Sequence, residues 1–219
     1  MWIDLSQPFS GDMPFASSLP APTFETVKHV EEDGLNVQVY NVPTHVGTHV
    51  DAPRHFVDGG KTIDELELDR FAGEGVVLDV SKDEPAEITV EDVESASGTV
   101  QQDDIVLLYT GWQDKYGTPA YDPHPWFSVE LAEWFVDREI KLVGVDNITV
   151  DIPGPHRPEG WLEYPVHRTL LGAEVLIAEH LANLEAHTGE RLEILGFPVP
   201  IAGGDGAPAR FVARTLEQP

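Results

Sequence analysis

The chain contains no cysteine among its 219 residues. Disulfide bonds, thiolate metal sites and a cysteine nucleophile are therefore excluded. Basic residues are also scarce, since 13 Lys and Arg stand against 39 Asp and Glu and give a formal net charge of -26. A surface of that charge repels nucleic acid, so we expect no nucleic-acid partner.

Long apolar runs are missing as well. No stretch is long enough to span a bilayer, and the N-terminus lacks the basic-then-apolar pattern of a secretory signal. We therefore expect no membrane association and a cytoplasmic location, with which the absence of cysteine agrees. Hydrophobic residues nevertheless make up 41% of the chain and no internal repeat is visible, which predicts a single domain over residues 1–219 with a sizeable core.

The acidic residues are scattered along the chain rather than gathered in a tail. One interpretation is an ordinary solvated acidic surface. The other is adaptation to high salt, where a Debye length of about 3 Å at molar ionic strength screens the repulsion that opposes a compact chain. We favour the halophilic interpretation.

The densest chemistry lies at residues 44–56, where the sequence THVGTHVDAPRHF holds three histidines and an aspartate. In an extended segment side chains alternate, so His45, His49, Asp51 and His55 share one face. A flat strand would hold the first and third of these roughly 20 Å apart, whereas ligands of one metal lie within about 3 to 4 Å of each other. The segment must therefore bend. The opposite, core-facing side carries Val46, Val50, Ala52 and Phe56.

Gly47 and Pro53 allow this bend, because glycine accepts unusual dihedral angles and proline ends strand pairing. A helix would also place His45 and His49 on one face, but the β-branched residues around Gly47 disfavour it. Independent core or surface histidines are the other alternative. Imidazole and carboxylate are ligands that suit zinc, manganese and iron, so we favour a metal site.

The rest of the chain alternates between strand and helix patterns. Strands are expected over residues 2–5, 23–29, 36–42, 75–80, 105–109, 142–146, 175–178, 191–197 and 209–216. Helical segments are expected over residues 63–66, 89–93, 128–138 and 167–172. An Asp-Gly pair at 33–34 predicts a hairpin turn, and Phe9 and Phe15 in the loop at 6–22 are placed to cover the site. A long functional loop is expected at 147–164, and the class is α/β or α+β.

Glu179 ends the apolar strand at 175–178, and a buried carboxylate needs a partner. A cation would satisfy it, and so would Arg168 or Arg210. His167 precedes a short helix, and spacing alone leaves its role open. The remaining histidines have no partner pattern and are expected to have surface or loop roles: His29, His124, His156, His187 and His180, which stands beside Glu179.

The stretch HVGTHVDAPRH resembles the H-x-G-T-H-x-D-x-P-x-H signature of the cyclase family of metal-dependent hydrolases, which includes bacterial kynurenine formamidases and isatin hydrolases. The resemblance extends to the proline-rich opening at 4–15, to LVGVDNITVD at 142–151, to the pair of His167 and Glu179, and to GGDGAPAR at 203–210. It covers nearly the whole chain. It implies a swivelling β/β/α fold with a mixed sheet and flanking helices.

The resemblance also implies metal-assisted hydrolysis of a C–N amide bond with one or two ions, zinc or manganese. His45, His49 and Asp51 would hold the first ion. A bridging Asp51 would hold the second ion together with His167 and Glu179. His55 is assigned to proton transfer. The chain has no G-x-S-x-G motif, which argues against a serine nucleophile.

For the substrate, the resemblance implies a small-molecule amide, N-formylkynurenine, which is cleaved to kynurenine and formate in tryptophan breakdown. A cyclic amide such as isatin is the alternative. A metal-binding protein without catalysis is a third possibility, which the presence of His55 beside five candidate ligands disfavours. Relatives form dimers or tetramers and the proline-rich opening suits packing against a neighbour, so we expect a homo-oligomer.

Overall fold

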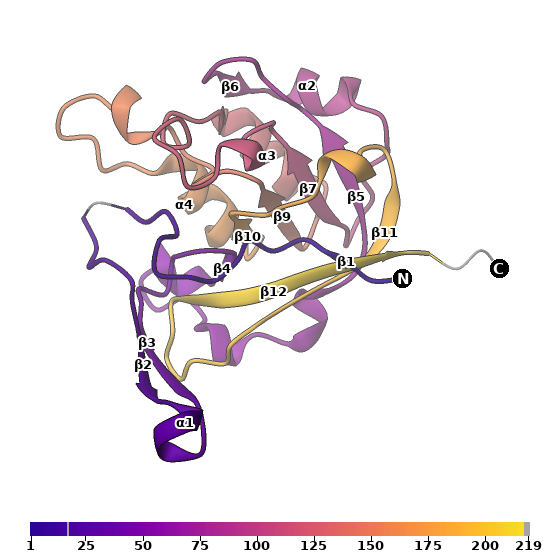
Figure 1. The fold of residues 1–219 in the computed structure, drawn as a ribbon. Coiled ribbons are helices and arrows are strands. Elements are labelled where there is room, and N and C mark those ends of the chain that lie inside the picture. Colours follow the sequence, from indigo (N-terminus) through magenta and orange to yellow (C-terminus); the bar gives the residue numbers. More distant parts are fainter. Residues whose placement is uncertain (17, 217–219) are drawn as a thin grey trace.

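The structure is a computed structural model that describes residues 1–16 and 18–216. Its centre is an eight-stranded sheet in the order β1-β12-β11-β5-β7-β9-β10-β4 (Figure 1). Strands β5, β7, β9 and β10 run parallel to one another, and the remaining pairs of the sheet are antiparallel. The bounds are β1 Ile3–Asp4, β4 His49–Asp51, β5 Ala72–Asp79, β7 Ile105–Tyr109, β9 Leu142–Val145, β10 Leu176–Glu179, β11 Arg191–Pro198 and β12 Gly206–Thr215.

Strand β12 also pairs with β4, so the sheet closes on itself. The closed side holds one hydrophobic core, to which most strands contribute alternate residues, such as Val77, Leu107, Ala178 and Ile194. This alternation is what the period of two in a strand dictates. Closure brings β4, from the first third of the chain, against β12.

Helices cover the other face of the sheet and form a second core with it. Their bounds are α2 Val90–Ser95, α3 Val129–Asp137 and α4 Pro165–Gly172. Thr89 and Asp92 cap α2 reciprocally, and the Ser128 hydroxyl accepts from the Leu131 amide at the start of α3. A mixed sheet with flanking helices confirms the predicted α/β class.

The short elements complete the architecture. The described residues include six single-turn 3-10 helices: η1 Pro53–His55, η2 Ile63–Glu65, η3 Leu68–Arg70, η4 Gln113–Lys115, η5 Gly154–His156 and η6 Glu185–His187. β6 (Glu87–Ile88) and β8 (Trp126–Phe127) form a small parallel pair. None of the helices in the described ranges has the length and apolar character needed to cross a membrane.

A hairpin of β2 (Thr23–Lys28) and β3 (Val37–Asn41) projects from the body (Figure 1). The predicted strand pairing is confirmed, but the Asp-Gly pair does not form a tight turn. A one-turn helix, α1 (Val30–Asp33), makes the connection instead, and Gly34 ends it with a φ of 75°. Glycine tolerates this left-handed conformation, which explains why the pair acts as a helix end.

Strand β5 begins at Ala72 rather than at residue 75, and two further predicted boundaries are also wrong by a few residues. Helix α4 begins at Pro165 rather than His167, because proline is well suited to the first turn of a helix, where its missing N–H is not needed. Strand β12 begins at Gly206 rather than at residue 209, because pairing with β4 extends it into the glycine-rich stretch. Both shifts lie next to the candidate site.

Candidate metal centre

The histidine-rich segment bends as predicted. Only His49–Asp51 is a strand, whereas residues 44–48 form a bend in which Gly47 has a φ of 60°. After β4, Pro53 starts the single turn of η1, which ends at His55. His49 and Asp51 are two apart in the strand and therefore point to the same side of it.

Strand pairing brings the next ligand candidate to this side. Glu179 in β10 lies directly opposite His49 in β4. His49 Nε2 is 3.3 Å from Asp51 Oδ1 and 3.4 Å from Glu179 Oε2. His167, from α4, approaches from the helix layer, and its Nε2 is 3.5 Å from both Asp51 Oδ2 and Glu179 Oε1. We call these four buried residues the buried half of the centre.

The other nitrogen of each imidazole in the buried half faces away from the carboxylates. His49 Nδ1 lies 2.8 Å from the carbonyl oxygen of Gly47, and His167 Nδ1 lies 2.6 Å from Asp151 Oδ2. Each Nδ1 thus donates a proton, and Nε2, which points at the carboxylates, is the nitrogen that a metal would bind in place of a proton. Within the described residues, His49 Nε2 and Asp51 Oδ2 have no hydrogen-bond partner.

A divalent metal fits this arrangement. Ligand atoms about 2.0 to 2.2 Å from one ion lie roughly 3 to 4 Å from each other, as the four contacts of the buried half do. Buried polar atoms without a partner are costly unless a ligand satisfies them. The Asp151–His167 contact has the form of the carboxylate that orients a metal-binding histidine.

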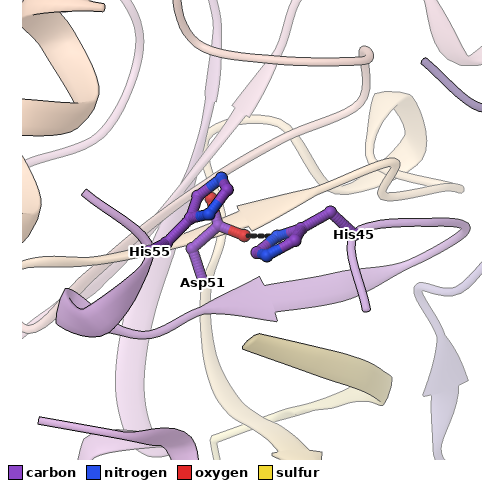
Figure 2. Close-up of side chains that lie close together, drawn as sticks. All are labelled: His45, Asp51 and His55. Atoms are coloured by element: carbon purple, nitrogen blue, oxygen red, sulfur yellow. Dashed lines mark hydrogen bonds and ion pairs between the residues drawn. The ribbon is translucent and has the colours of Figure 1, made fainter. Parts of the chain in front are cut away.

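His45, His55 and Asp205 form a second group, which we call the open half. His45 Nδ1 is 2.7 Å from Asp51 Oδ1, the bond drawn in Figure 2, and its Nε2 is 3.0 Å from Asp205 Oδ2. His55 stacks on His45 at 3.7 Å between ring centroids, and its Nδ1 is 3.6 Å from Asp205 Oδ2. The His45 and His55 side chains are 15% and 26% exposed. A Cβ on Gly206 would lie 2.7 Å from His45 Cε1, so glycine makes room for this ring.

The pKa values show that the cluster attracts positive charge. Burial lowers the pKa of His49, but the neighbouring carboxylates of Asp51 and Glu179 outweigh burial and raise it to about 10. Burial likewise lowers the pKa of His45, and Asp51 and Asp205 raise it to about 9. For Glu179, burial and the charge of Asp51 raise the pKa, but His167 and His49 bring it down to about 2. A metal ion would take the place of these protons.

Asp51 connects the two halves. Candidate ligand atoms of His45, Asp51 and His55 lie within 4.8 Å of one another, and so do those of His49, Asp51 and Glu179. The structure thus places His49 beside Glu179 and brings His45 and His55 together. All five predicted ligands and His55 meet in one place, and the division of the ligands between two ions remains a prediction.

A cavity of about 580 Å³ opens onto the centre. His45, His55, His167, Glu179 and Asp205 line it, as does Phe15 from the N-terminal loop. The prediction that Phe9 covers the site is wrong, because Phe9 lines a separate cavity of about 830 Å³ on the other side of residues 41–44. The larger cavity contains none of the clustered histidines, so the smaller one is the candidate active site.

Two of the histidines for which surface or loop roles were expected are buried. His180 lines the active-site cavity, with its Nδ1 3.0 Å from the Tyr121 hydroxyl and its ring 5.8 Å from that of His49. Burial and the charge of His49 lower the pKa of His180 to about 3, so its ring is neutral. His124 is also buried, and its Nδ1 donates to the Pro125 carbonyl.

Sequence reasoning gave no role to Asp205 or Asp151, although both lie in stretches that carry the family resemblance. Each contacts a predicted site histidine. An arginine partner for Glu179 is not observed, since Arg168 contacts backbone carbonyls and Arg210 pairs with Asp4. Glu179 instead faces His49, His167 and the amide of Val150.

A model of the family described as "Putative cyclase" matches residues 3–152. The chain is 28% identical over 219 residues to the kynurenine formamidase of Geobacillus thermodenitrificans, and 98% of each chain is covered. Isatin hydrolase A from Ralstonia solanacearum has a similar structure, with a TM-score of 0.84, 25% identity, and coverage of 99% of this chain and 92% of that one. A "predicted metal-dependent hydrolase" from Bacillus stearothermophilus matches with a TM-score of 0.77 and 26% identity, and 97% of each chain is covered.

Proposed function

The chain belongs to the cyclase family, and we propose that it is a metal-dependent hydrolase of amide C–N bonds, an arylformamidase that cleaves N-formylkynurenine to kynurenine and formate. The observation that carries the proposal is the buried half of the metal centre. Its imidazole and carboxylate atoms lie 3.3 to 3.5 Å apart, and two of its residues, His167 and Glu179, line a cavity of small-molecule size. The full-length likeness to a kynurenine formamidase supports the choice of substrate.

We assign His45, His49 and Asp51 to one ion and Asp51, His167 and Glu179 to a second. Asp51 can bridge, because its Oδ1 faces His45 and His49 while its Oδ2 faces His167. Zinc and manganese both suit this donor set. When bound, such an ion polarises a carbonyl and lowers the pKa of its bound water toward neutral pH.

His55 is the proposed proton carrier. Its Nδ1 faces Asp205, which leaves Nε2 as the nitrogen that exchanges protons. Nε2 would take a proton from the attacking water and return it to the nitrogen that leaves as the C–N bond breaks. The hydrogen bond from His45 and the nearby imidazole of His55 lower the pKa of Asp205 well below its usual range, so this carboxylate stays charged beside His55.

Two other functions remain as alternatives. Hydrolysis of a cyclic amide such as isatin is favoured by the likeness to isatin hydrolase A. Metal binding without catalysis is disfavoured, because His55 lies at the cavity and beside an ionised carboxylate. Incubating metal-loaded protein with N-formylkynurenine, isatin and formanilide, followed by ultraviolet absorbance, distinguishes the three. Turnover of isatin alone would contradict arylformamidase activity, and no turnover would contradict both hydrolases.

We also propose that the chain forms a homo-oligomer, a dimer or a tetramer. The hairpin of β2 and β3 supports this, because it projects from the body and exposes Val27, Val37, Val39 and Tyr40. An isolated two-stranded hairpin is marginally stable in water, and exposed apolar patches often mark contact surfaces. Light scattering coupled to size exclusion tests the proposal, and a monomeric mass at micromolar concentration would contradict it.

A further inference from the structure

Arg157 is the one Lys or Arg among the described residues that line the active-site cavity. It comes from the long loop at 147–164, next to η5. The wall between Arg157 and the metal centre consists of aromatic rings. Tyr164 lies 5.1 Å from Phe56, and Phe56 lies 4.6 Å from His167, measured between ring centroids. A ligand that lies along this wall can therefore reach the centre with one end and Arg157 with the other.

The guanidinium of Arg157 is held in position. Its Nε donates to the Ile152 carbonyl at 2.7 Å, and its Nη1 donates to the Tyr164 hydroxyl at 3.1 Å. Its central carbon lies 5.0 Å from the Trp161 ring centroid and 4.9 Å from that of Tyr164. These contacts leave the Nη2 donors without an acceptor in the described part of the chain. The group is thus fixed in place and still able to bind.

Arg157 also has no carboxylate partner within the described residues. The chain has 39 acidic and 13 basic side chains, and eight of the basic ones pair with a carboxylate of the described residues. Arg138 shows this, because it stacks on Trp134 and also pairs with Glu94. A guanidinium that is anchored, faces a cavity and is unpaired in so acidic a chain is a ready site for an anion.

We propose that Arg157 binds a carboxylate of the substrate, so that the preferred substrate is an anionic aryl amide that carries an amino-acid carboxylate at the end remote from the scissile bond. This inference rests on the proposed amidase function of the metal centre. N-formylkynurenine has such a carboxylate, whereas isatin and formanilide lack one. Arg157 is therefore a specificity-determining residue, and it distinguishes the proposed substrate class from the alternatives.

The test compares Arg157→Gln with wild type on N-formylkynurenine and on formanilide. Loss of a charge-assisted pair should raise KM for the anionic substrate and lower its kcat/KM by about 10- to 100-fold. Hydrolysis of formanilide should be unchanged. Arg157→Lys should fall between the two, because an ammonium group keeps the charge but not the planar pair of donors. Arg138→Gln removes the same charge from a stacked arginine outside the cavity and should behave like wild type on both substrates.

An equal loss on both substrates would overturn the proposal, because it would show that Arg157 only supports the cavity wall. No loss on either substrate would overturn it as well. Calorimetric titration with the product kynurenine and with 2-aminoacetophenone, which lacks the carboxylate, gives a readout without turnover. Wild type that hydrolyses neither amide contradicts the proposed function alone. Equal affinity of wild type and Arg157→Gln for kynurenine contradicts the carboxylate site whatever the activity.

Discussion

The two halves of the metal centre use their histidine nitrogens differently. In the buried half, His49 and His167 each donate one N–H to a fixed oxygen outside the cluster and direct the other nitrogen at shared carboxylates. In the open half, His45 places both nitrogens against carboxylates, and His55 lies partly in solvent. The buried half therefore has the preorganisation of a metal site, and His55 in the open half has the access that proton exchange requires.

Asp51→Asn should have the largest effect, because Asp51 contacts histidines of both the buried and the open half of the centre. An amide carries no charge and offers one oxygen, so we expect loss of bound metal and loss of detectable hydrolysis. Elemental analysis together with the N-formylkynurenine assay measures both. Asp58→Asn, the same change at an exposed side chain, should leave both unchanged. Full metal occupancy in Asp51→Asn would contradict the bridging role.

His55→Ala separates the halves. The variant should keep its metal but turn over about 100-fold more slowly or worse, which is the usual scale for loss of a general acid or base. Single-turnover kinetics on metal-loaded protein measures this loss. His187→Ala removes a histidine that pairs with Glu190 away from the cavity and is the matched control. Activity near that of wild type would contradict a role for His55 in proton transfer.

Asp151→Asn weakens only the buried half. Asp151 accepts from His167 Nδ1 and from the amides of Val166 and His167, so the change should disturb the orientation of that imidazole. Loss of such a supporting carboxylate costs about 10- to 100-fold in metal affinity or activity, and we expect the lower end. Competition with a chelator measures the affinity. Unchanged affinity and unchanged activity would show that His167 is oriented by packing alone.

The sequence predicted the site residues of the segment 44–56 better than the site residues that lie elsewhere in the chain. Residues 44–56 are contiguous, and the alternation of polar and apolar residues with Gly47 and Pro53 predicts a bent segment whose polar groups gather on one side. Glu179 and His167 lie far away in the chain, and only the family resemblance linked them to this segment. The pairing of β10 with β4 and the packing of α4 bring them there.

Asp205 could not be found from local signals. It lies 160 residues from His45, and the two meet because β12 closes the sheet against β4. Strand order is a non-local property, since it depends on which edges pair in the folded chain. The same closure determines that His45 shares Asp205 with His55, which no spacing along the segment indicates. The short helix in the hairpin was missed because Gly34 signals a helix end as well as a turn.

Salt should affect the exposed surface far more than the buried half, and its effect on the centre is the smallest we predict. With a net charge of -26, repulsion opposes compactness at low ionic strength, where the Debye length is about 30 Å at 0.01 M. The Tm should therefore rise steeply between low and molar potassium chloride at constant metal concentration, whereas bound metal per chain should stay constant. A Tm that is flat or falls would contradict adaptation to high salt.

The metal content of His49→Ala and His55→Ala, purified and loaded side by side with wild type, tests the division of the centre most directly. His49 lies within the buried half, and His55 stands in the open half within ligand distance of Asp51. We predict that His49→Ala loses bound metal and that His55→Ala retains the content of wild type. Retention in His49→Ala, or an equal loss in both variants, would contradict the assignment of metal binding to His49 and of proton transfer to His55.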